Sequence, residues 1–363
     1  MTTNLNALLH PDPLSGMVDR FADQSENRNW ISIYEEGEKI DANVDGTFRW
    51  DELRYSQDLA PISLQDSPST GKKKLLQTPK TGSVFVIQEH VDLPMRFLEG
   101  VRNPGTEVAD AAGKIANEVR ELTSKVTATE NYWACKSLTT QGGVVNLASF
   151  PNSGIKAGSL TYPVLDLDAA NTWATAGTKI RSAEINAMKK AYFQANGFKA
   201  RRAMGTSKVD QYLTANTEIS NFFSGQREAG RIAARSFEEM RSSNDMVGRL
   251  GGIDWALAED YYALDSAKDT AVDVVADGDV FALLPGRERS QQVFAIARGV
   301  NYVPTGQVAG QIMGATGLLR AVRGRGAFVE LMQGGRGLRL YVFSSICLVQ
   351  KMPKAVAAFD MTP

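Results

Sequence analysis

TEVADAAGKIANEVRELTSKVTATENYWACKS (residues 106–137) carries the clearest periodicity in the sequence. Its apolar residues recur at alternating spacings of four and three, which places one apolar stripe along a helix. Thr106 is suited to cap the N-terminus, and Gly142-Gly143 lie beyond the end. At a rise of about 1.5 Å per residue, this helix is about 48 Å long. The stripe consists of Val108, Ala112, Ile115, Val119, Leu122 and Val126.

The residues before this helix predict an arm and a hairpin. Residues 1–30 contain two prolines and Gly16 without a sustained period, so we expect an extended arm. From Trp30 to about Leu93 no helix is expected, because the strand-like pieces TFRWDELRY and SVFVI are separated by turn-rich sequence. A structureless stretch of that length is uncommon in a compact domain. We therefore expect a long hairpin that projects from the body and needs a partner to cover it.

The residues after the helix mix helices and strands without regular alternation. A second amphipathic helix is predicted at 178–195 and ends at Gly197. The fold class is therefore α+β rather than a doubly wound sheet. A long helix laid across a sheet satisfies the stripe of 106–137, and a coiled coil of about three heptads is the alternative. The other predicted pieces are a strand at 199–205, helices beginning at 207 and 227, a strand-like run at 251–264, two apolar pieces joined by a turn at Asp277-Gly278, a glycine-rich basic segment at 304–337 and a β-rich ending at 338–361.

The composition is that of an ordinary globular protein, with 43% hydrophobic and 22% charged residues among 363. No apolar run of about 18 residues and no signal-peptide pattern occurs, so neither a membrane span nor secretion is expected. Cys135 and Cys347 are the only cysteines. They argue against a disulfide framework and favour two core residues in a reducing compartment.

Charge is distributed unevenly along the chain, although the net charge is only -1. Residues 1–70 hold 13 Asp and Glu against 5 Lys and Arg, whereas residues 285–340 hold 8 Arg against 2 Glu. In a self-assembling subunit, an acidic arm lying on a neighbour's basic surface would fix the register between them. The arginines could also bind DNA phosphates, but no aromatic residues interleave with them, which favours acidic neighbours. The candidate inter-subunit contacts are Lys72, Lys73, Lys74, Arg320, Arg323, Arg325, Arg336 and Arg339.

Sequence motifs of common catalytic sites are absent. The chain has no GxSxG, HExxH, CxxC or GxGxxG pattern, and the lysines at 72–74 do not complete a phosphate-binding loop, because Asp66 replaces the first glycine. His10 and His90 stand far from any group of ligand spacing, so surface or packing roles are expected. The sequence predicts no catalytic residue and no cofactor.

A hard cation is the remaining possibility that the residue types suggest. Asp273, Asp277 and Asp279 could supply oxygen ligands, but they surround a predicted turn and lack the spacing and closing Glu of a calcium loop. A solvated hairpin explains them better, so no metal ligand is predicted.

Several segments together resemble the major capsid protein E family of lambda-like tailed phages, which uses the capsid fold named after phage Hong Kong 97. LAPISLQDSPST (59–70) resembles the apolar-proline segment before the family's Ser/Pro/Gly turn. VFVIQEHVDLPMRFLEGVRNPG (84–105) resembles the run that opens the spine helix. NTWATAGTKIRSAEINAMKKAYFQANGFKARRAMG (171–205), and GGIDWALAEDYY (251–262) followed by DGDVFALLPG (277–286), match the later succession. The resemblance covers nearly the whole chain.

This resemblance implies a division of the chain. It places an N-terminal arm at 1–30, an extended hairpin loop at 31–85, a peripheral domain at 86–170 and 341–363 with the spine helix at about 106–137, and an axial domain at 171–340. The glycine-rich segment at 304–337 is longer than the resemblance leads us to expect.

The resemblance also implies a function without catalysis. The chain would be a major capsid protein that self-assembles into hexamers and pentamers of an icosahedral head enclosing double-stranded DNA. Its expected partners are itself, a portal protein, a decoration protein, packaged DNA by non-specific contact and, since the sequence begins at Met1, a separate scaffolding protein. Assembly in the host cytoplasm and location in the virion are expected. An encapsulin-like compartment shell enclosing an enzyme cargo is the alternative.

Overall fold

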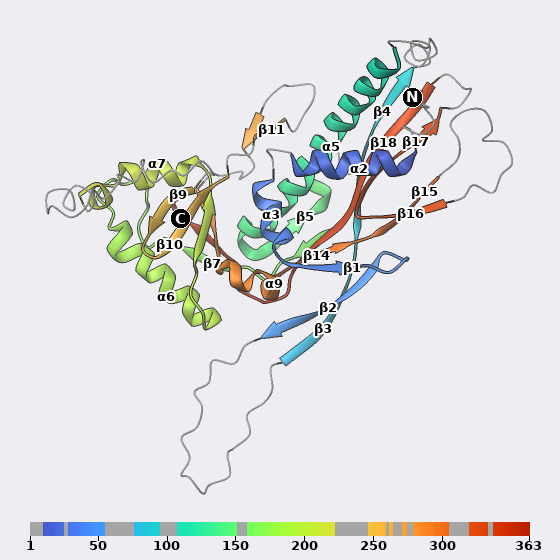
Figure 1. Cartoon of the computed structure of the whole chain (residues 1–363). Coiled ribbons are helices and arrows are strands. Elements are labelled where there is room, and N and C mark those ends of the chain that lie inside the picture. The colour runs from blue at the N-terminus through green and yellow to red at the C-terminus, as the bar shows by residue number, and fades with distance from the viewer. Residues whose placement is uncertain are drawn as a thin grey trace, which may run out of the picture.

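The computed structural model of the chain describes residues 10–24, 28–54, 76–94, 107–150, 158–221, 246–258, 261–263, 271–273, 279–304, 319–332 and 337–363. Two halves, each built from helices and a sheet, lie side by side, and a two-stranded ribbon projects away from them (Figure 1). The predicted α+β class is confirmed.

The first half is built on a five-stranded sheet centred on the long strand β18 (Gly337–Gln350). Strand β4 (Phe85–Pro94) pairs with β18 in antiparallel register from Gly337↔Pro94 to Ile346↔Phe85. Strand β17 (Arg325–Leu331) pairs with the same part of β18 along its other edge. The far end of β18 pairs with β14 (Phe294–Arg298), and β1 (Glu38–Asp41) pairs with β14 in parallel.

The long helix α5 (Glu107–Thr139) is laid across this sheet, as the apolar stripe predicts. Ile115 and Val119 are fully buried, and Leu122 and Val126 are at most 3% exposed. They share one apolar cluster with residues of β17 and β18, which include Val329, Leu338, Leu340 and Val342. The sheet therefore takes the place that a second helix would have in a coiled coil.

The second half is built on a six-stranded sheet with an aromatic core. The ring of Trp173 lies 5.5 to 6.3 Å from those of Phe359, Phe281 and Trp255. The π-helical turn η3 (Ile180–Glu184) leads into α6 (Ile185–Asn196), and Gly197 ends this helix with φ +73°, as predicted. Helix α7 (Ser207–Ala215) follows the predicted short strand β8. In sheet order the strands are β7 (Leu165–Asp168), β19 (Ala357–Asp360), β13 (Val280–Leu284), β8 (Arg202–Gly205), β10 (Ile253–Leu257) and β9 (Met246–Leu250).

Smaller elements complete the described part of the chain. Three two-stranded pairs join β5 (Val144–Asn146) with β6 (Ser159–Thr161), β11 (Tyr261–Ala263) with β12 (Ala271–Asp273), and β15 (Val300–Pro304) with β16 (Leu319–Arg323). The short helices are η1 (Gln141–Gly143), η2 (Leu147–Ser149), η5 (Arg287–Arg289) and α9 (Ser290–Val293).

The expectation of an extended, helix-free N-terminus is wrong in two places. Pro11–Asp23 forms helix α2, with Pro11 in its first turn, where a missing N–H costs nothing. Its Leu14, Val18 and Ala22 recur every four residues and are fully buried. Asn29–Glu35 forms a second helix, α3, inside the stretch expected to hold only strands. Burial of apolar side chains against the body outweighs the weak local preference of these short segments.

Two further expectations fall in a part of the chain that the structure describes incompletely. Of the apolar piece before Asp277-Gly278 the structure describes residues up to Asp273, which end β12 and pair with β11, whereas the piece after it forms β13 and pairs with β19 and β8. The helix predicted to begin at 227 lies outside the described residues.

Sheet membership also divides the chain differently from the boundaries that the resemblance implies. Strands β14 and β17 fall within 171–340, yet they belong to the five-stranded sheet with β4. Strands β7 and β19 fall within 86–170 and 341–363, yet they belong to the six-stranded sheet. The described parts of the glycine-rich segment, β16 and β17, lie with the first half because β17 pairs with β18.

The turn after α5 depends on two glycines that make a matched test. Gly142 and Gly143 both have positive φ, of +72° and +64°. A Cβ at Gly143 would lie 1.8 Å from the Tyr162 carbonyl oxygen, whereas a Cβ at Gly142 would have nothing within 4 Å. Gly142→Ala should lower the free energy of unfolding by about 1 kcal/mol through its left-handed backbone. Gly143→Ala should lower it by about 1–3 kcal/mol more, because the backbone must also shift. Urea unfolding of both variants checks this, and equal losses would contradict it.

Candidate functional site: a projecting ribbon and a buried charge cluster

The ribbon is an antiparallel pair that extends beyond the body of the molecule (Figure 1). Strand β2 (Thr47–Arg54) pairs with β3 (Leu76–Ser83) over their full lengths, from Thr47↔Ser83 to Arg54↔Leu76. These two strands lie within the segment predicted as a projecting hairpin and occupy only part of 31–85. The predicted strand SVFVI instead lies mostly in β4, within the five-stranded sheet.

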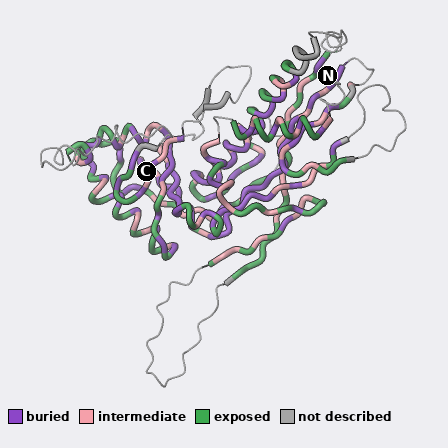
Figure 2. Tube along the Cα trace, in the orientation of Figure 1, coloured by how far each residue is buried: buried purple, intermediate pink, exposed green. Residues whose placement is uncertain are grey.

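Strand β2 is held against the body, and strand β3 is largely uncovered. Phe48 stacks on Trp50 with ring centroids 5.3 Å apart, and both rings lie over Gly82, where a side chain would collide with them. The Leu53 amide donates to the Lys351 carbonyl at 2.7 Å, which ties β2 to the end of β18. Most described residues of β3 are exposed (Figure 2). Phe48 belongs to the main apolar cluster of the body, and Trp50 and Leu53 pack against that cluster. The exposed strand β3 is therefore the part of the ribbon that is suited to be covered by another molecule.

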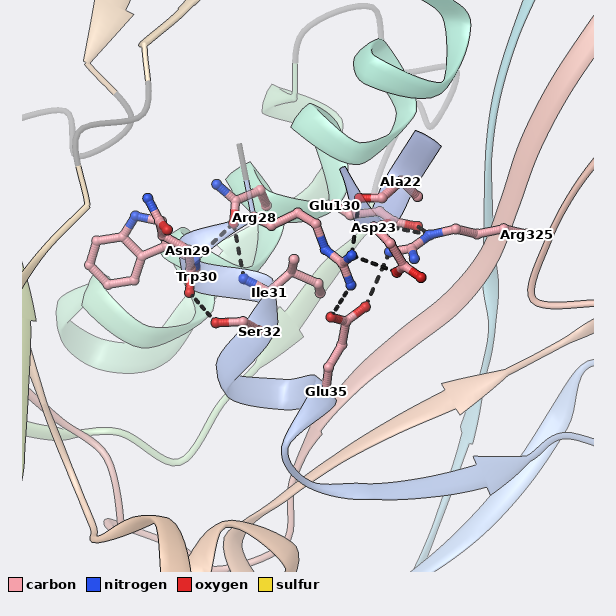
Figure 3. Close-up of polar contacts among 11 residues, drawn as sticks. Ala22, Asp23, Arg28, Asn29, Trp30, Ile31, Ser32, Glu35, Glu130 and Arg325 are labelled. Carbon is pink, nitrogen blue, oxygen red and sulfur yellow. Dashed lines mark hydrogen bonds and ion pairs between the residues drawn. The ribbon is translucent and has the colours of Figure 1, made fainter. Parts of the chain in front are cut away.

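A cluster of buried charges joins the N-terminal helices to the body (Figure 3). Arg325 of β17 donates from Nε to both carboxylate oxygens of Glu130 on α5 at 3.1 Å, and also pairs with Glu35 of α3. Arg28 pairs with the same Glu35, and its guanidinium donates to Asp23 at 2.7 Å and to the Ala22 carbonyl at 3.0 Å. Helices α2, α3 and α5 and strand β17 thus converge on one network.

Burial makes this network unusual among the ion pairs of the chain. The Glu130 side chain is fully buried, and that of Arg325 is 10% exposed. Burial alone would lower the pKa of the Arg325 guanidinium, but the carboxylates of Glu130 and Glu35 outweigh it and raise that pKa above its ordinary value. Loss of either partner would leave an uncompensated charge in the interior.

A second polar anchor lies beside this cluster and has no signal in the local sequence. The side-chain oxygen of Asn131 on α5 accepts from the amides of Trp30 and Ile31, at 2.8 and 2.9 Å. These amides lie in the first turn of α3, where helix N–H groups lack partners within the helix. The cap of α3 is thus supplied by a residue about a hundred positions away.

The arginines predicted to contact neighbouring subunits have carboxylate partners within the chain. Arg320 pairs with Asp12, and Arg323 pairs with Asp41. Arg339 pairs with Asp92 through two bonds of 2.6 and 2.9 Å. The acidic N-terminal segment and the basic region therefore meet inside one subunit.

The other candidate contacts divide into two groups. Arg325 is better explained as the internal cation described above, because it is buried. Lys72, Lys73, Lys74 and Arg336 lie outside the described residues.

The described part of the chain has neither a candidate metal site nor a helix suited to span a membrane. It holds no group of three or more His, Cys, Asp or Glu side chains that could bind a metal ion. Asp279 receives hydrogen bonds from Tyr212 at 2.8 Å and Lys208 at 3.3 Å, which explains its carboxylate without a cation. None of the helices in these residues is long and apolar enough to cross a membrane.

Comparisons with known proteins give a structural likeness without a sequence match. No family model matches the chain. No curated protein matches it either. A prophage protein of E. coli CFT073 described as a capsid protein superposes with a TM-score of 0.57 at 11% identity, covering 96% of this chain and 99% of that chain. A phage-related protein from Bordetella bronchiseptica RB50 gives 0.49 at 9% identity over 97% of both chains. A virus-like particle from Pyrococcus furiosus gives 0.45 at 8% identity, over 96% of this chain and 99% of that one.

The first of these likenesses shows the fold. Nearly the whole of both chains is covered, so the shared architecture includes both halves. The expected fold of Hong Kong 97-type capsid proteins is thereby confirmed, whereas membership of the lambda-like family stays a prediction.

Proposed function

We propose that this chain is the major capsid protein of a tailed double-stranded DNA phage, a shell subunit without catalytic activity. The observation that carries the proposal is the fold likeness to the E. coli prophage capsid protein over nearly the full length of both chains. Hexamers and pentamers of the subunit would build an icosahedral head around the DNA. The protein would be located in the virion after assembly in the host cytoplasm.

The projecting ribbon supports this proposal on physical grounds. Exposed strands that extend beyond the body add contact area that a compact subunit lacks, and many modest contacts sum to a stable shell. Lys72, Lys73 and Lys74 belong to the segment between β2 and β3 and are proposed to contact a neighbour there. Arg320, Arg323 and Arg339 are proposed as a second contact surface, since their guanidinium groups stay partly exposed beside their internal partners.

The remaining partners are proposed from the same function. A head of this kind needs a portal protein for DNA entry, a separate scaffolding protein to set its curvature, and can carry a decoration protein outside. The ribbon of β2 and β3 with its connecting segment would act between subunits, and a peripheral and an axial domain would correspond to the two halves. The sheets suggest that β14, β17 and β18 belong to the peripheral half.

Shortening the ribbon tests the assembly role. The register places Arg54 opposite Leu76, so an Asn-Gly turn in place of residues 55–75 can close the ribbon without removing a described strand. A replacement that reached Lys80 would cut into β3, where Lys80 lies opposite Trp50. We expect a folded, soluble subunit that fails to form shells or stops at capsomers. Circular dichroism reports folding, and sedimentation velocity reports assembly.

Both arms of that experiment are decisive. Normal shells from the shortened chain would contradict the assembly role of the ribbon, and an unfolded chain would mean that the removed segment packs on its own body. The encapsulin-like alternative is tested on purified wild-type particles by nucleic-acid content and mass spectrometry. Double-stranded DNA supports the capsid proposal, whereas one dominant enzyme cargo without DNA would overturn it.

A further inference from the structure

The second half of the molecule carries a run of basic side chains, of which Arg202 pairs with Glu36 at 2.7 Å. Between residues 179 and 202, seven residues are Lys or Arg, and the only acidic residue is Glu184. Glu184 is 4% exposed and accepts from the Ala170 amide at 3.0 Å and the Asn171 side chain at 3.1 Å, so its charge is directed inward. The seven basic residues are Lys179, Arg181, Lys189, Lys190, Lys199, Arg201 and Arg202.

The exposed members of this set lie on and around helix α6. Lys179 precedes η3, Lys190 lies on the outer side of α6, and Lys199 and Arg201 follow its C-terminus; all four are exposed. No carboxylate of the described residues lies within ion-pair distance of any of these four side chains. We call this surface, formed by Lys179, Lys190, Lys199 and Arg201, the α6 basic face.

Strands β9 and β10 extend the same surface. The Lys189 ammonium donates to the Gly251 carbonyl at 2.6 Å, which holds α6 beside the turn after β9. Arg249 of β9 is exposed and lies 3.4 Å from the Asp254 carboxylate. Asp254 is thus engaged by Arg249, and Glu218 accepts from the amides of Arg181 and Ser182. A net positive charge therefore remains.

The arginine-rich region differs from the α6 basic face because its cations have carboxylate partners. Arg320, Arg323 and Arg339 each have a carboxylate partner, so an incoming phosphate would have to compete with it. The cations of the α6 basic face have no such competitor. Binding of a polyanion there releases counterions without breaking an internal ion pair.

The ion pairs within the chain also argue against a second copy of this chain as the partner that binds the α6 basic face. Three N-terminal carboxylates that could complement a basic surface, those of Asp12, Glu38 and Asp41, are already paired with Arg320, Lys351 and Arg323. Duplex DNA, in contrast, carries one negative charge for about every 1.7 Å of its axis. We propose that the α6 basic face contacts the phosphate backbone of duplex DNA without reading its sequence, an inference that rests on the proposed function for the identity of the polyanion.

A matched pair of charge variants tests this proposal. The variant Lys190→Gln/Lys199→Gln/Arg201→Gln removes three charges from the face. The control Lys39→Gln/Lys125→Gln/Lys354→Gln removes three charges from exposed lysines elsewhere. Binding of a fluorescent duplex of about 30 base pairs to the full-length subunit is measured by anisotropy over a salt series. We expect the face variant to bind about tenfold or more weakly near 50 mM salt, with a slope of log affinity against log salt lower by about 2 to 3.

The other results overturn the proposal in distinguishable ways. Equal losses in the two variants would mean that binding follows net charge, and unchanged binding in the face variant would exclude this surface. Loss of shells with unchanged DNA binding would make the face a contact between copies. If the wild type fails to form shells, the proposed function is contradicted. If the same protein still binds DNA through the α6 basic face, the inference about that face stands.

Discussion

Val119→Asp should yield subunits that are insoluble or unfolded. Val119 is fully buried at the middle of the α5 stripe, against β17 and β18. A carboxylate there has no partner, and burial of an uncompensated charge costs several kcal/mol. Loss of the apolar side chain adds about 1.5–3 kcal/mol. Together these losses approach the whole stability of a typical domain, which is about 5–15 kcal/mol. The soluble fraction after expression and the far-ultraviolet circular dichroism of the soluble protein measure the effect.

A control on the same helix separates burial from helix chemistry. Asn117→Asp introduces the same carboxylate two positions earlier, at an exposed site of α5. Its free energy of unfolding should stay within about 0.5 kcal/mol of the wild type. A soluble Val119→Asp subunit that melts cooperatively near the wild-type temperature would refute the packing of α5 on the sheet.

Removal of the central carboxylate of the buried charge cluster should have the second largest effect. Glu130→Ala leaves the Arg325 guanidinium in the interior with only the more distant Glu35, at 3.4 Å. Breaking one partner of a buried pair typically costs about 3–5 kcal/mol. We therefore expect the urea midpoint of Glu130→Ala to fall sharply.

A double variant shows whether the cost comes from the orphaned charge. Replacement of both partners, as Glu130→Leu with Arg325→Met, removes the charges together and should recover about 2 kcal/mol or more of the loss. Glu35→Gln is the milder comparison, because Arg325 then keeps Glu130. A Glu130→Ala variant within about 1 kcal/mol of the wild type would mean that water or rearrangement satisfies Arg325.

The sequence predicted those elements that have a long periodic apolar pattern or a local signal at their ends. The α5 stripe spans many turns, so its period is unambiguous, and the observed helix differs from the predicted one by at most two residues at each end. Gly197 marked the end of α6 because a left-handed C-cap favours glycine. Helix α3 had no comparable signal, since Asn131 supplies its cap from another element.

The candidate contacts show the same limit on prediction from sequence. The concentration of arginines at 285–340 was visible, but their partners were not, because Arg325 and Glu130 are 195 positions apart and meet only in the fold. Charge counting over segments therefore could not show that these groups also pair within one subunit. The four residues of the α6 basic face were also visible in the sequence, within a stretch that holds seven basic residues and one acidic residue. Only the buried position of Glu184 reveals that its charge does not offset them.

The path of the chain through β18 and β19 has a consequence for the order of events during synthesis. Strand β18 is the centre of the first sheet, and β19 lies between β7 and β13 in the second. Neither sheet can close before residues 337–360 have left the ribosome, so nascent chains on a polysome remain unable to associate as native subunits. The many contacts between distant residues make folding after release comparatively slow. Subunits that are able to assemble would then appear only after residues 337–360 have emerged, and not when the first half of the chain emerges.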